Sequence, residues 1–359
     1  MDDVEGVLQK LGLQEIEGYT FQEAMGGGSA LTSLYKKNDE LIVFKFLICP
    51  RNPIELERFK LEYSVLDKNR LNFCNCRGRV PLSESNFLGP EESYPLPKVK
   101  YPLTHAFDTL VSYFGYEFES GVLLSKLETS QYNINQKTDL LFRLASALNY
   151  FNRTGYSHRD LHPDNILLLD GHLMVNVDRA GKENNPKIKF LDMGNCQRTQ
   201  LESDWMYRIE RDLDEDAVFE DNNRRLLSSF ISMPPDFLDK GENIRNYDTW
   251  AFGIYAYQLF FNCLPSGVND LGDVARLRDT REFSQEYKGN LSKLPIGLRL
   301  ILNHLLSPKG EMRPSSDAVV RLFSWPVQRS EEFIDENFIK RVIHNDGFDP
   351  DYDPHEDYY

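Results

Sequence analysis

One stretch of sequence decides the fold of this chain: Tyr156-Ser157-His158-Arg159-Asp160-Leu161-His162-Pro163-Asp164-Asn165-Ile166-Leu167-Leu168. It holds a carboxylate, Asp160, and an amide, Asn165, in a tight loop just before an apolar strand, so the two side chains can face one site from two sides. A second motif, Phe190-Leu191-Asp192-Met193-Gly194, follows further along the chain. An Asp-x-Gly turn alone is common, but this one follows an apolar strand and lies downstream of the loop, which makes the pair of motifs specific.

The two motifs resemble the catalytic loop and the metal-binding turn of the eukaryotic-type protein kinases, over about residues 18–325. The resemblance implies an α+β, bilobed fold with a β-rich N-lobe and a helical C-lobe, and transfer of the γ-phosphoryl group of ATP with Mg²⁺. Asp160 matches the aspartate that accepts the proton of the substrate hydroxyl. Asn165 and Asp192 match the residues that hold metal ions, since a hard dication prefers oxygen ligands. An ordinary Asp/Asn-rich turn is the alternative.

Lys45 is a charged residue inside the otherwise apolar segment Leu41–Phe46. Such a charge is costly unless it has an anionic partner. In the kinase resemblance this lysine pairs with the α- and β-phosphates and with a glutamate on a helix. Glu62 is the best match for that glutamate, with Glu57 as the competitor. An exposed lysine on an edge strand is the alternative interpretation.

Gly26, Gly27 and Gly28 resemble the glycine loop that covers the phosphates, where backbone N–H groups can approach anionic oxygens. The pattern departs from the family twice, because Leu31 stands at the third glycine and Ser33 at the valine that packs on the adenine. A simple hairpin turn is the alternative. The resemblance further implies an adenine-binding hinge around residues 125–128, which makes the following residues candidates for nucleotide binding: Ser125, Lys126 and Leu127.

Three weaker matches separate protein kinases from a runner-up family. Asp248 matches an aspartate that braces the catalytic loop, and Asp236 with Arg313 matches a buried ion pair at the close of the activation segment. His162, however, stands where serine/threonine kinases usually carry a lysine, and is similar to the small-molecule phosphotransferases of the aminoglycoside and choline kinase type. Those enzymes lack the activation segment and the Asp248-type helix start, so a protein substrate is favoured.

Two residues point to specificity and control. Ser229 lies where serine/threonine kinases have a hydroxyl that bridges to the catalytic aspartate. Arg159 resembles the arginine that grips a phosphorylated activation segment, since a guanidinium binds phosphate through two hydrogen bonds. We therefore expect control by phosphate at one of four hydroxyls: Thr199, Ser203, Ser228 or Ser229. The acidic residues 212–216 and 220–221 are the alternative source of negative charge.

Apolar periodicity divides the chain into four parts: an N-terminal extension (1–17), a kinase N-lobe (18–127), a kinase C-lobe (128–325) and an acidic C-terminal tail (326–359). Strand patterns cover residues 21–35, 41–48, 110–118 and 122–127, and a helix is expected over 53–68. Further helices are expected from 136 to 151, over 249–264 and early in the tail. Residues 70–105 are left open as a partner-binding insert or a loop, and residues 169–187 are expected to form a turn between two strands.

Composition restricts the partners. The chain has 359 residues, 41% of them hydrophobic, and a formal net charge of −15. This charge argues against binding nucleic acid or an anionic membrane and favours a basic protein substrate. The five cysteines suggest thiols rather than a metal site, because Cys74 and Cys76 find no second pair. The opening residues have no secretory character, so we expect a cytoplasmic protein; the oligomeric state stays open.

The sequence thus predicts an ATP- and Mg²⁺-dependent serine/threonine protein kinase, with autophosphorylation included. Two alternatives stay open. One is a small-molecule kinase, and the other is a catalytically weak pseudokinase that serves as a scaffold, which the unusual glycine loop favours. The catalytic set of Lys45, Asp160, Asn165 and Asp192 argues for an enzyme that acts by electrostatic positioning.

Overall fold

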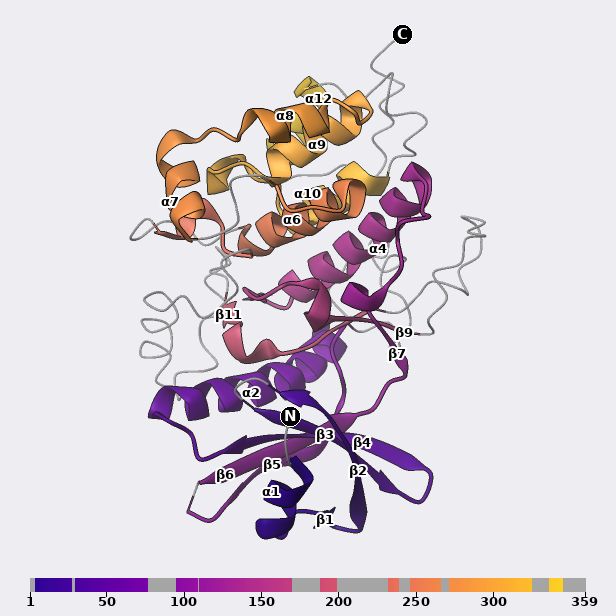
Figure 1. Ribbon diagram of the computed structural model, residues 1–359, viewed down its shortest axis with the longest axis vertical. Helices are drawn as coiled ribbons and strands as arrows, with labels where there is room; N and C mark the ends of the chain where they lie inside the picture. Colours follow the sequence, from indigo (N-terminus) through magenta and orange to yellow (C-terminus); the bar gives the residue numbers. More distant parts are fainter. Residues whose placement is uncertain are drawn as a thin grey trace.

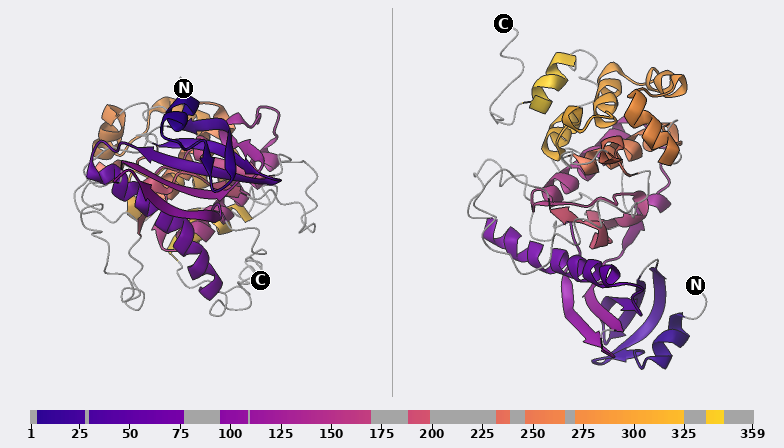
Figure 2. Two further views of the ribbon diagram at one scale, coloured as in Figure 1. Left: turned by 90° about the horizontal axis from the view of Figure 1, so that it is seen from below. Right: turned by 90° about the vertical axis from the view of Figure 1, so that its left-hand side faces the viewer.

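Figure 1 shows the computed structural model, which describes residues 4–27, 30–76, 95–108, 110–169, 188–198, 232–238, 246–265, 271–324 and 336–344. A curled sheet forms the N-terminal part and helices form most of the C-terminal part. The long helix α2 (Pro53–Cys76) lies between them in both side views of Figures 1 and 2. The expected α+β, bilobed fold is confirmed.

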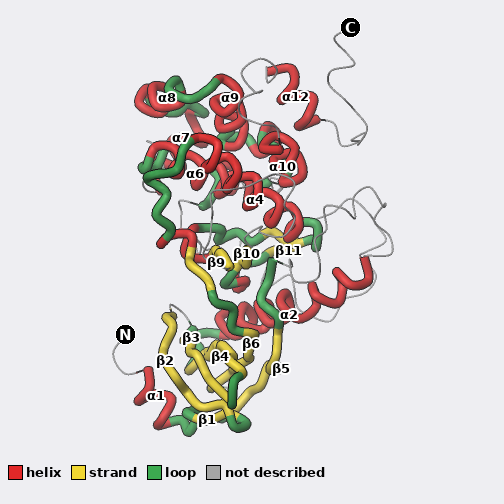
Figure 3. Tube along the Cα trace, turned by 90° about the vertical axis from the view of Figure 1, so that its right-hand side faces the viewer, coloured by secondary structure: helices red, strands yellow, loops and turns green. Residues whose placement is uncertain are grey.

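The described residues of the first lobe form a six-stranded antiparallel sheet in the order β1-β2-β3-β4-β6-β5, whose strands are labelled in Figure 3. Its strands are β1 (Glu15–Ile16), β2 (Tyr19–Gly27), β3 (Leu31–Lys37), β4 (Glu40–Ile48), β5 (Val99–Ala106) and β6 (Val111–Glu117). Lys37 pairs with Glu40, so β3 and β4 are joined by a two-residue turn, Asn38 and Asp39. Asn38 has a positive φ of 54°, a conformation that asparagine tolerates well.

The two faces of this sheet bury different side chains, because neighbouring residues of a strand point to opposite faces. On the outer face the rings of Tyr35 and Phe44 lie 5.0 Å apart, in a core that also holds Leu8 of helix α1 (Val4–Lys10). On the inner face Phe114 packs on Phe59 of α2 with ring centroids 5.0 Å apart. The outer face is therefore a closed apolar core, and the inner face meets α2.

Two parts of the first lobe differ from the sequence expectation. Residues 70–105 were expected to lack compact strands, but β5 occupies 99–106 and forms the edge of the sheet. Its proline, Pro102, lies at an irregularity in the pairing with β6, where an edge strand accommodates the missing N–H. The N-terminal residues were expected to be an extension, but Leu13 and Ile16 are buried in the outer core.

A second, three-stranded sheet in the described residues has the order β10-β9-β7 and carries the two motifs of the sequence. Its strands are β7 (Gly121–Leu123), β9 (Ile166–Leu169) and β10 (Ile188–Phe190). The expected turn between β9 and β10 falls mostly outside the described residues, but the two strands pair with each other as expected. A short ladder joins β8 (Tyr156–Ser157) to β11 (Gln197–Arg198).

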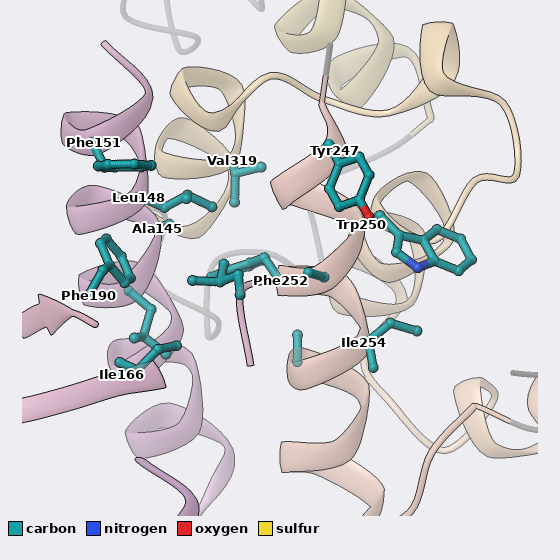
Figure 4. Close-up of a cluster of buried hydrophobic side chains, with 14 of the residues drawn as sticks. Ala145, Leu148, Phe151, Ile166, Phe190, Tyr247, Trp250, Phe252, Ile254 and Val319 are labelled. Carbon is teal, nitrogen blue, oxygen red and sulfur yellow. The ribbon is translucent and has the colours of Figure 1, made fainter. Parts of the chain in front are cut away.

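The described helices of the second lobe surround a core shown in Figure 4, where α4 and α6 face each other across Leu148 and Phe252. They are α4 (Ile134–Asn152), α6 (Tyr247–Phe261), α7 (Leu271–Thr280), α8 (Gln285–Leu291), α9 (Ile296–Leu305), α10 (Ser316–Ser324) and α12 (Glu336–His344). Asn133 and Gln136 form a capping box at the start of α4. The helix α12 is the one expected early in the tail, and its Ile339 is fully buried.

Among the helices that the structure describes, none is both long enough and apolar enough to cross a membrane.

Candidate active site

Lys45 lies on β4 and reaches Glu62 on α2, with 2.7 Å from its Nζ to each carboxylate oxygen. Both residues are buried, at 9% and 4% exposure. Burial would lower the pKa of Lys45, but the Glu62 and Asp192 carboxylates more than offset it and raise that pKa above its ordinary value. Glu57, the competing glutamate, pairs with Lys60 at 2.7 Å instead. The structure therefore brings Lys45 and Glu62 together.

Asp192 is the second carboxylate on Lys45, at 3.1 Å from Oδ1 to Nζ. Lys45 lowers the pKa of Asp192 below its ordinary value, against the effect of burial. Half of the Asp192 side chain (50%) is exposed. Its backbone has a left-handed φ of 59°, which is uncommon outside glycine and turns the carboxylate back toward Lys45 and α2. Met193, the residue after Asp192, is fully buried.

In the loop at residues 158–165, which resembles the catalytic loop of the kinases, side chains of the loop hold its backbone in place. Asn165, at the end of the 3₁₀ turn η3 (Pro163–Asn165), donates from Nδ2 to the backbone oxygen of Asp160 at 3.0 Å. The same Nδ2 lies 3.0 Å from Nε2 of His162, and that nitrogen lies 4.0 Å from Oδ1 of Asp160. The N–H of Leu191 donates to the Asn165 carbonyl at 2.8 Å. The loop and the metal turn are thus directly bonded.

Asp248, in the first turn of α6, binds the backbone of this loop. Its carboxylate accepts from the backbone N–H groups of His158 at 2.8 Å and Arg159 at 2.9 Å, and from Nδ2 of Asn152 at 2.8 Å. Arg159 has a left-handed φ of 64°, and its N–H is held by one of these bonds. A buried carboxylate with three donors is well satisfied and fixes the residue just before Asp160.

The side chain of Arg159 is enclosed, at 4% exposure. Its Nη1 donates to Oε1 of Gln197 at 2.6 Å, and its guanidinium lies over the rings of Phe237 at 4.9 Å and Tyr247 at 5.3 Å. The four hydroxyls expected to carry phosphate, Ser229 among them, lie outside the described residues. Binding of phosphate by Arg159 stays a prediction, and Gln197 is one of the partners that its guanidinium has in the structure.

Asp236 and Arg313 form the expected buried pair, with 2.7 Å from Nη2 of Arg313 to each oxygen of Asp236. Gly310 provides the space, because a side chain at that position would collide with the Asp236 carboxylate and the Arg313 guanidinium. Asp236 lies in the 3₁₀ turn η6 (Pro235–Leu238), and Arg313 follows η7 (Gly310–Met312).

The register of β3 corrects the expected role of Ser33. Residues directly opposite each other in an antiparallel pair share a face. Thr32 pairs with Lys45 and Leu34 with Val43, whereas Ser33 pairs with Phe44 of the outer core. The glycine-loop pattern was therefore aligned one residue too early at this point, and Leu34 is the apolar residue on the Lys45 face.

The glycines themselves are described only in part. Gly26 has a φ of 144°, which side chains rarely adopt, next to a register shift between Ala24 and Gly26. Gly27 ends β2, and Gly28 lies outside the described residues. Leu31, in the expected third glycine position, begins β3 and packs against the outer core rather than on the Lys45 face.

The position of the hinge is also corrected. The first sheet ends with β6 at Glu117 and the second begins with β7 at Gly121, so residues 118–120 cross between the lobes. The expected hinge residues, Ser125 and Lys126 with Leu127 after them, lie in and just beyond the 3₁₀ turn η2 (Leu124–Lys126), past β7. The hinge was predicted too late in the sequence because apolar residues continue through β7 and η2, so the sequence does not mark where the first lobe ends.

The residues at this site fit a magnesium ion by their chemistry. Asp192 offers a half-exposed carboxylate, and Asn165, whose Nδ2 donates within the loop, offers its amide oxygen. Among the described residues, no group of three His, Cys, Asp or Glu side chains could hold a metal by itself. Mg²⁺ commonly takes one or two protein carboxylates and completes its shell with phosphate oxygens and water.

Sequence reasoning missed several residues around this site. Asn195 donates from Nδ2 to Oδ2 of Asp160 at 3.2 Å. Tyr116 lies on the Lys45 face of β6, because Val43 is its partner in β4, and burial raises its pKa. Lys189 of β10 contacts Glu119 of the crossing segment at 3.1 Å. The alternation of β4 and β6 could have placed Tyr116, but a single sequence carries no signal for the other contacts.

Known proteins support the kinase resemblance. A family model described as the protein kinase domain matches residues 110–323, more than half of the chain. The chain belongs to the protein kinase domain family. The match covers the loop with Asp160 and Asn165, the turn with Asp192, and the second-lobe helices from α4 to α10, but not α12.

Curated relatives are serine/threonine kinases at low identity. The serine/threonine-protein kinase WARTS homolog of Caenorhabditis elegans is 26% identical over an alignment of 176 residues, and the match covers 42% of this chain and 18% of that protein. The Aurora kinase of Schizosaccharomyces pombe is 24% identical over 192 residues, 50% of this chain and 41% of that protein. The protein kinase C-like 2 of the same yeast is 26% identical over 155 residues, 43% of this chain and 12% of that protein. The chain spans less than half the length of each.

Proposed function

We propose that this protein transfers the γ-phosphoryl group of ATP to serine or threonine hydroxyls of protein substrates, including its own. The observation that carries the proposal is the chain of contacts from Glu62 to Lys45 at 2.7 Å and from Lys45 to Asp192 at 3.1 Å. An ammonium shared by two carboxylates, one of them half-exposed, sits beside a loop that presents Asp160 and Asn165. These are the parts that phosphoryl transfer needs, which is mainly positioning and charge neutralisation.

Each side chain has a proposed task. Lys45, oriented by Glu62, binds the phosphates of the nucleotide. Asp192 and Asn165 would hold Mg²⁺, which when bound neutralises the charge of the phosphate oxygens. Asp160 accepts the proton of the substrate hydroxyl and orients its oxygen. Leu34, Val43 and Tyr116 lie on the Lys45 face of the sheet and are candidates to line the nucleotide site.

The domain division remains part of the proposal. With the crossing segment at 118–120, the first lobe covers residues 18–117 together with the packed N-terminal residues, the second covers 121–325 in place of the expected 128–325, and an acidic tail covers 326–359. The net charge of −15 supports a basic protein as substrate, because opposite charges steer encounter. The serine/threonine names of the relatives support the choice of hydroxyl.

The test is transfer from γ-labelled ATP with magnesium to myelin basic protein and to the chain itself, with the label located by mass spectrometry. We expect label on serine or threonine, reduced about 100-fold or more in Asp160→Asn and in Asp192→Asn. Asp317→Asn is the matched control, since this aspartate of α10 pairs with Arg321 at 3.1 Å outside the candidate site. Equal transfer by wild type and both site variants would refute the assignment.

A small-molecule kinase is the second candidate, and one observation favours it. His162 lies 4.0 Å from Asp160, in the position where serine/threonine kinases usually carry a lysine. The same assay with choline and an aminoglycoside in place of protein decides between the two. Label on the small molecule and none on protein would favour this candidate. Absence of ATP binding in wild type would favour the scaffold.

A further inference from the structure

Asn195 connects the metal turn to the catalytic carboxylate. It closes the 3₁₀ turn η4 (Met193–Asn195), directly after the Asp192–Gly194 motif. Its Nδ2 donates to Oδ2 of Asp160 at 3.2 Å. The other oxygen, Oδ1, is the one that lies 4.0 Å from His162. The two oxygens of Asp160 therefore have different surroundings, and Asn195 defines which one points toward the turn.

Other hydrogen bonds hold the main chain around Asp160. Asn165 bonds to the backbone oxygen of Asp160, and Asp248 holds the N–H of the preceding residue. These bonds fix the main chain of the loop. The rotation of the carboxylate about its own bonds is a separate freedom, because terminal sp³–sp² torsions are broad and roughly two-fold.

We propose that Asn195 is a positioning residue, which holds the Asp160 carboxylate so that one oxygen faces the substrate hydroxyl. This inference rests on the proposed function. An amide suits the task because it donates a hydrogen bond without adding charge, so Asp160 stays an anion that can accept a proton. A lysine or arginine here would pair with Asp160 and weaken it as a base.

The same contact links two halves of the site. Asn195 lies three residues after Asp192, on the short turn whose Met193 is buried beside α2. A turn that places Asp192 against Lys45 thus also places Asn195 against Asp160. The carboxylate that binds the metal and the carboxylate that accepts the proton are oriented by one segment of four residues, 192–195.

The experiment compares the full chain with Asn195→Ala and Asn195→Asp, using γ-labelled ATP, magnesium and myelin basic protein. Asn195→Ala lowers kcat about 10-fold, the value expected for one hydrogen bond to a charged group, and leaves the KM for ATP within about two-fold. Asn195→Asp lowers kcat further, because it sets two carboxylates against each other. Asn149→Ala is the control and should keep the wild-type kcat. It removes an amide that donates to Asp317 at 3.4 Å, in a contact outside the candidate site.

A double variant separates positioning from a general structural role. In the Asp160→Asn background, Asn195→Ala causes no further loss of kcat, since the group that it positions is no longer a base. An equal further loss in that background, or a wild-type kcat in Asn195→Ala alone, overturns the inference while the proposed function stands.

A readout without transfer covers the remaining case, in which wild type itself transfers no phosphate and the proposed function fails. In a crystal structure of Asn195→Ala, we expect the Asp160 carboxylate to occupy more than one orientation. A single orientation identical to that of wild type overturns the inference on its own.

Discussion

Two buried ion pairs in this molecule each join a cation to a carboxylate at 2.7 Å, but their surroundings differ. Arg313 donates from Nη2 to both oxygens of Asp236 at 2.7 Å, and its other nitrogens reach the backbone oxygens of Ser307 and Asn246. Lys45 also meets a carboxylate at 2.7 Å, but it shares its charge with a second, half-exposed one, Asp192. The arginine pair is enclosed on all sides that the structure describes, whereas the lysine pair opens toward solvent through Asp192.

The difference teaches what each pair can do. A guanidinium with a planar fork, bonded in several directions, fixes one geometry and suits a structural joint. An ammonium is a compact charge with rotatable donors, so it can exchange one anionic partner for another. The lysine pair is suited to meet a phosphate, and the arginine pair is suited to hold η6 against η7.

The largest effect is expected at the structural pair. Arg313→Met leaves the Asp236 carboxylate buried without its partner, and we expect a loss of about 3–5 kcal/mol in the free energy of unfolding. Urea unfolding followed by circular dichroism measures it. Arg276→Met, which removes an exposed pair with Asp273, costs less than about 1 kcal/mol. Adding Asp236→Leu to Arg313→Met restores part of the loss; no restoration would contradict the account.

The second effect is on transfer rather than on stability. Lys45→Met removes the charge that is proposed to bind phosphates, and we expect the rate of label transfer to fall about 100-fold. Lys60→Met is the matched control. Lys60 pairs with Glu57 at 2.7 Å, and both lie on α2, the helix that also carries Glu62. If both variants lost activity equally, the contrast between the two ion pairs would no longer hold.

A third effect is a pH dependence that Lys45→Met creates. Burial raises the pKa of the Glu62 carboxyl, and the substitution removes the lysine that opposes this effect. A carboxyl whose folded pKa is raised stabilises the fold at pH below its unfolded pKa, and this contribution is lost as the pH rises through the folded pKa. Unfolding of Lys45→Met, measured from mildly acidic to mildly alkaline pH, should show falling stability. A flat profile relative to wild type would contradict it.

The smallest effect concerns a third buried cation, Arg159, which has a neutral partner. Gln197→Ala removes the 2.6 Å bond to its Nη1, and we expect a loss of about 1.5 kcal/mol in unfolding free energy. Gln197→Glu should be tolerated or stabilising, because it supplies an anion to the guanidinium. A destabilisation by glutamate as large as that by alanine would show that the pocket does not favour negative charge.

Much of the fold could be predicted because its strongest signals are local. The apolar stripe of α4 and the nearly all-apolar α6 predict their own helices, and the strand around Lys45 is a nearly continuous apolar run. Glu62 could be chosen over Glu57 by likeness to a known pattern. The edge strand β5 was missed because Pro102 weakens its local signal, and only pairing with β6 along the sheet stabilises it.

The finer parts of the site could not be read from one chain. The contacts of Asn195 with Asp160 and of Lys189 with Glu119 join residues 35 and 70 positions apart, and depend on how segments distant in the sequence pack together. The face of Ser33 depends on register, and a shift of one residue in alignment exchanges the two faces of a strand. Resemblance to a family locates the glycine-loop motif, but the pairing of β3 with β4 determines which face of the sheet Ser33 takes.

The two-residue turn at Asn38 and Asp39 therefore sets the register of β3 against β4 at the candidate site. Its length sets which residue of β3 stands opposite Lys45, and that residue is Thr32. Lengthening the turn by one residue would change the parity of the pairing, so that Leu31 and Ser33 would take the face now held by Thr32 and Leu34. The length of a hairpin tip would then determine which side chains of β3 face the candidate nucleotide site.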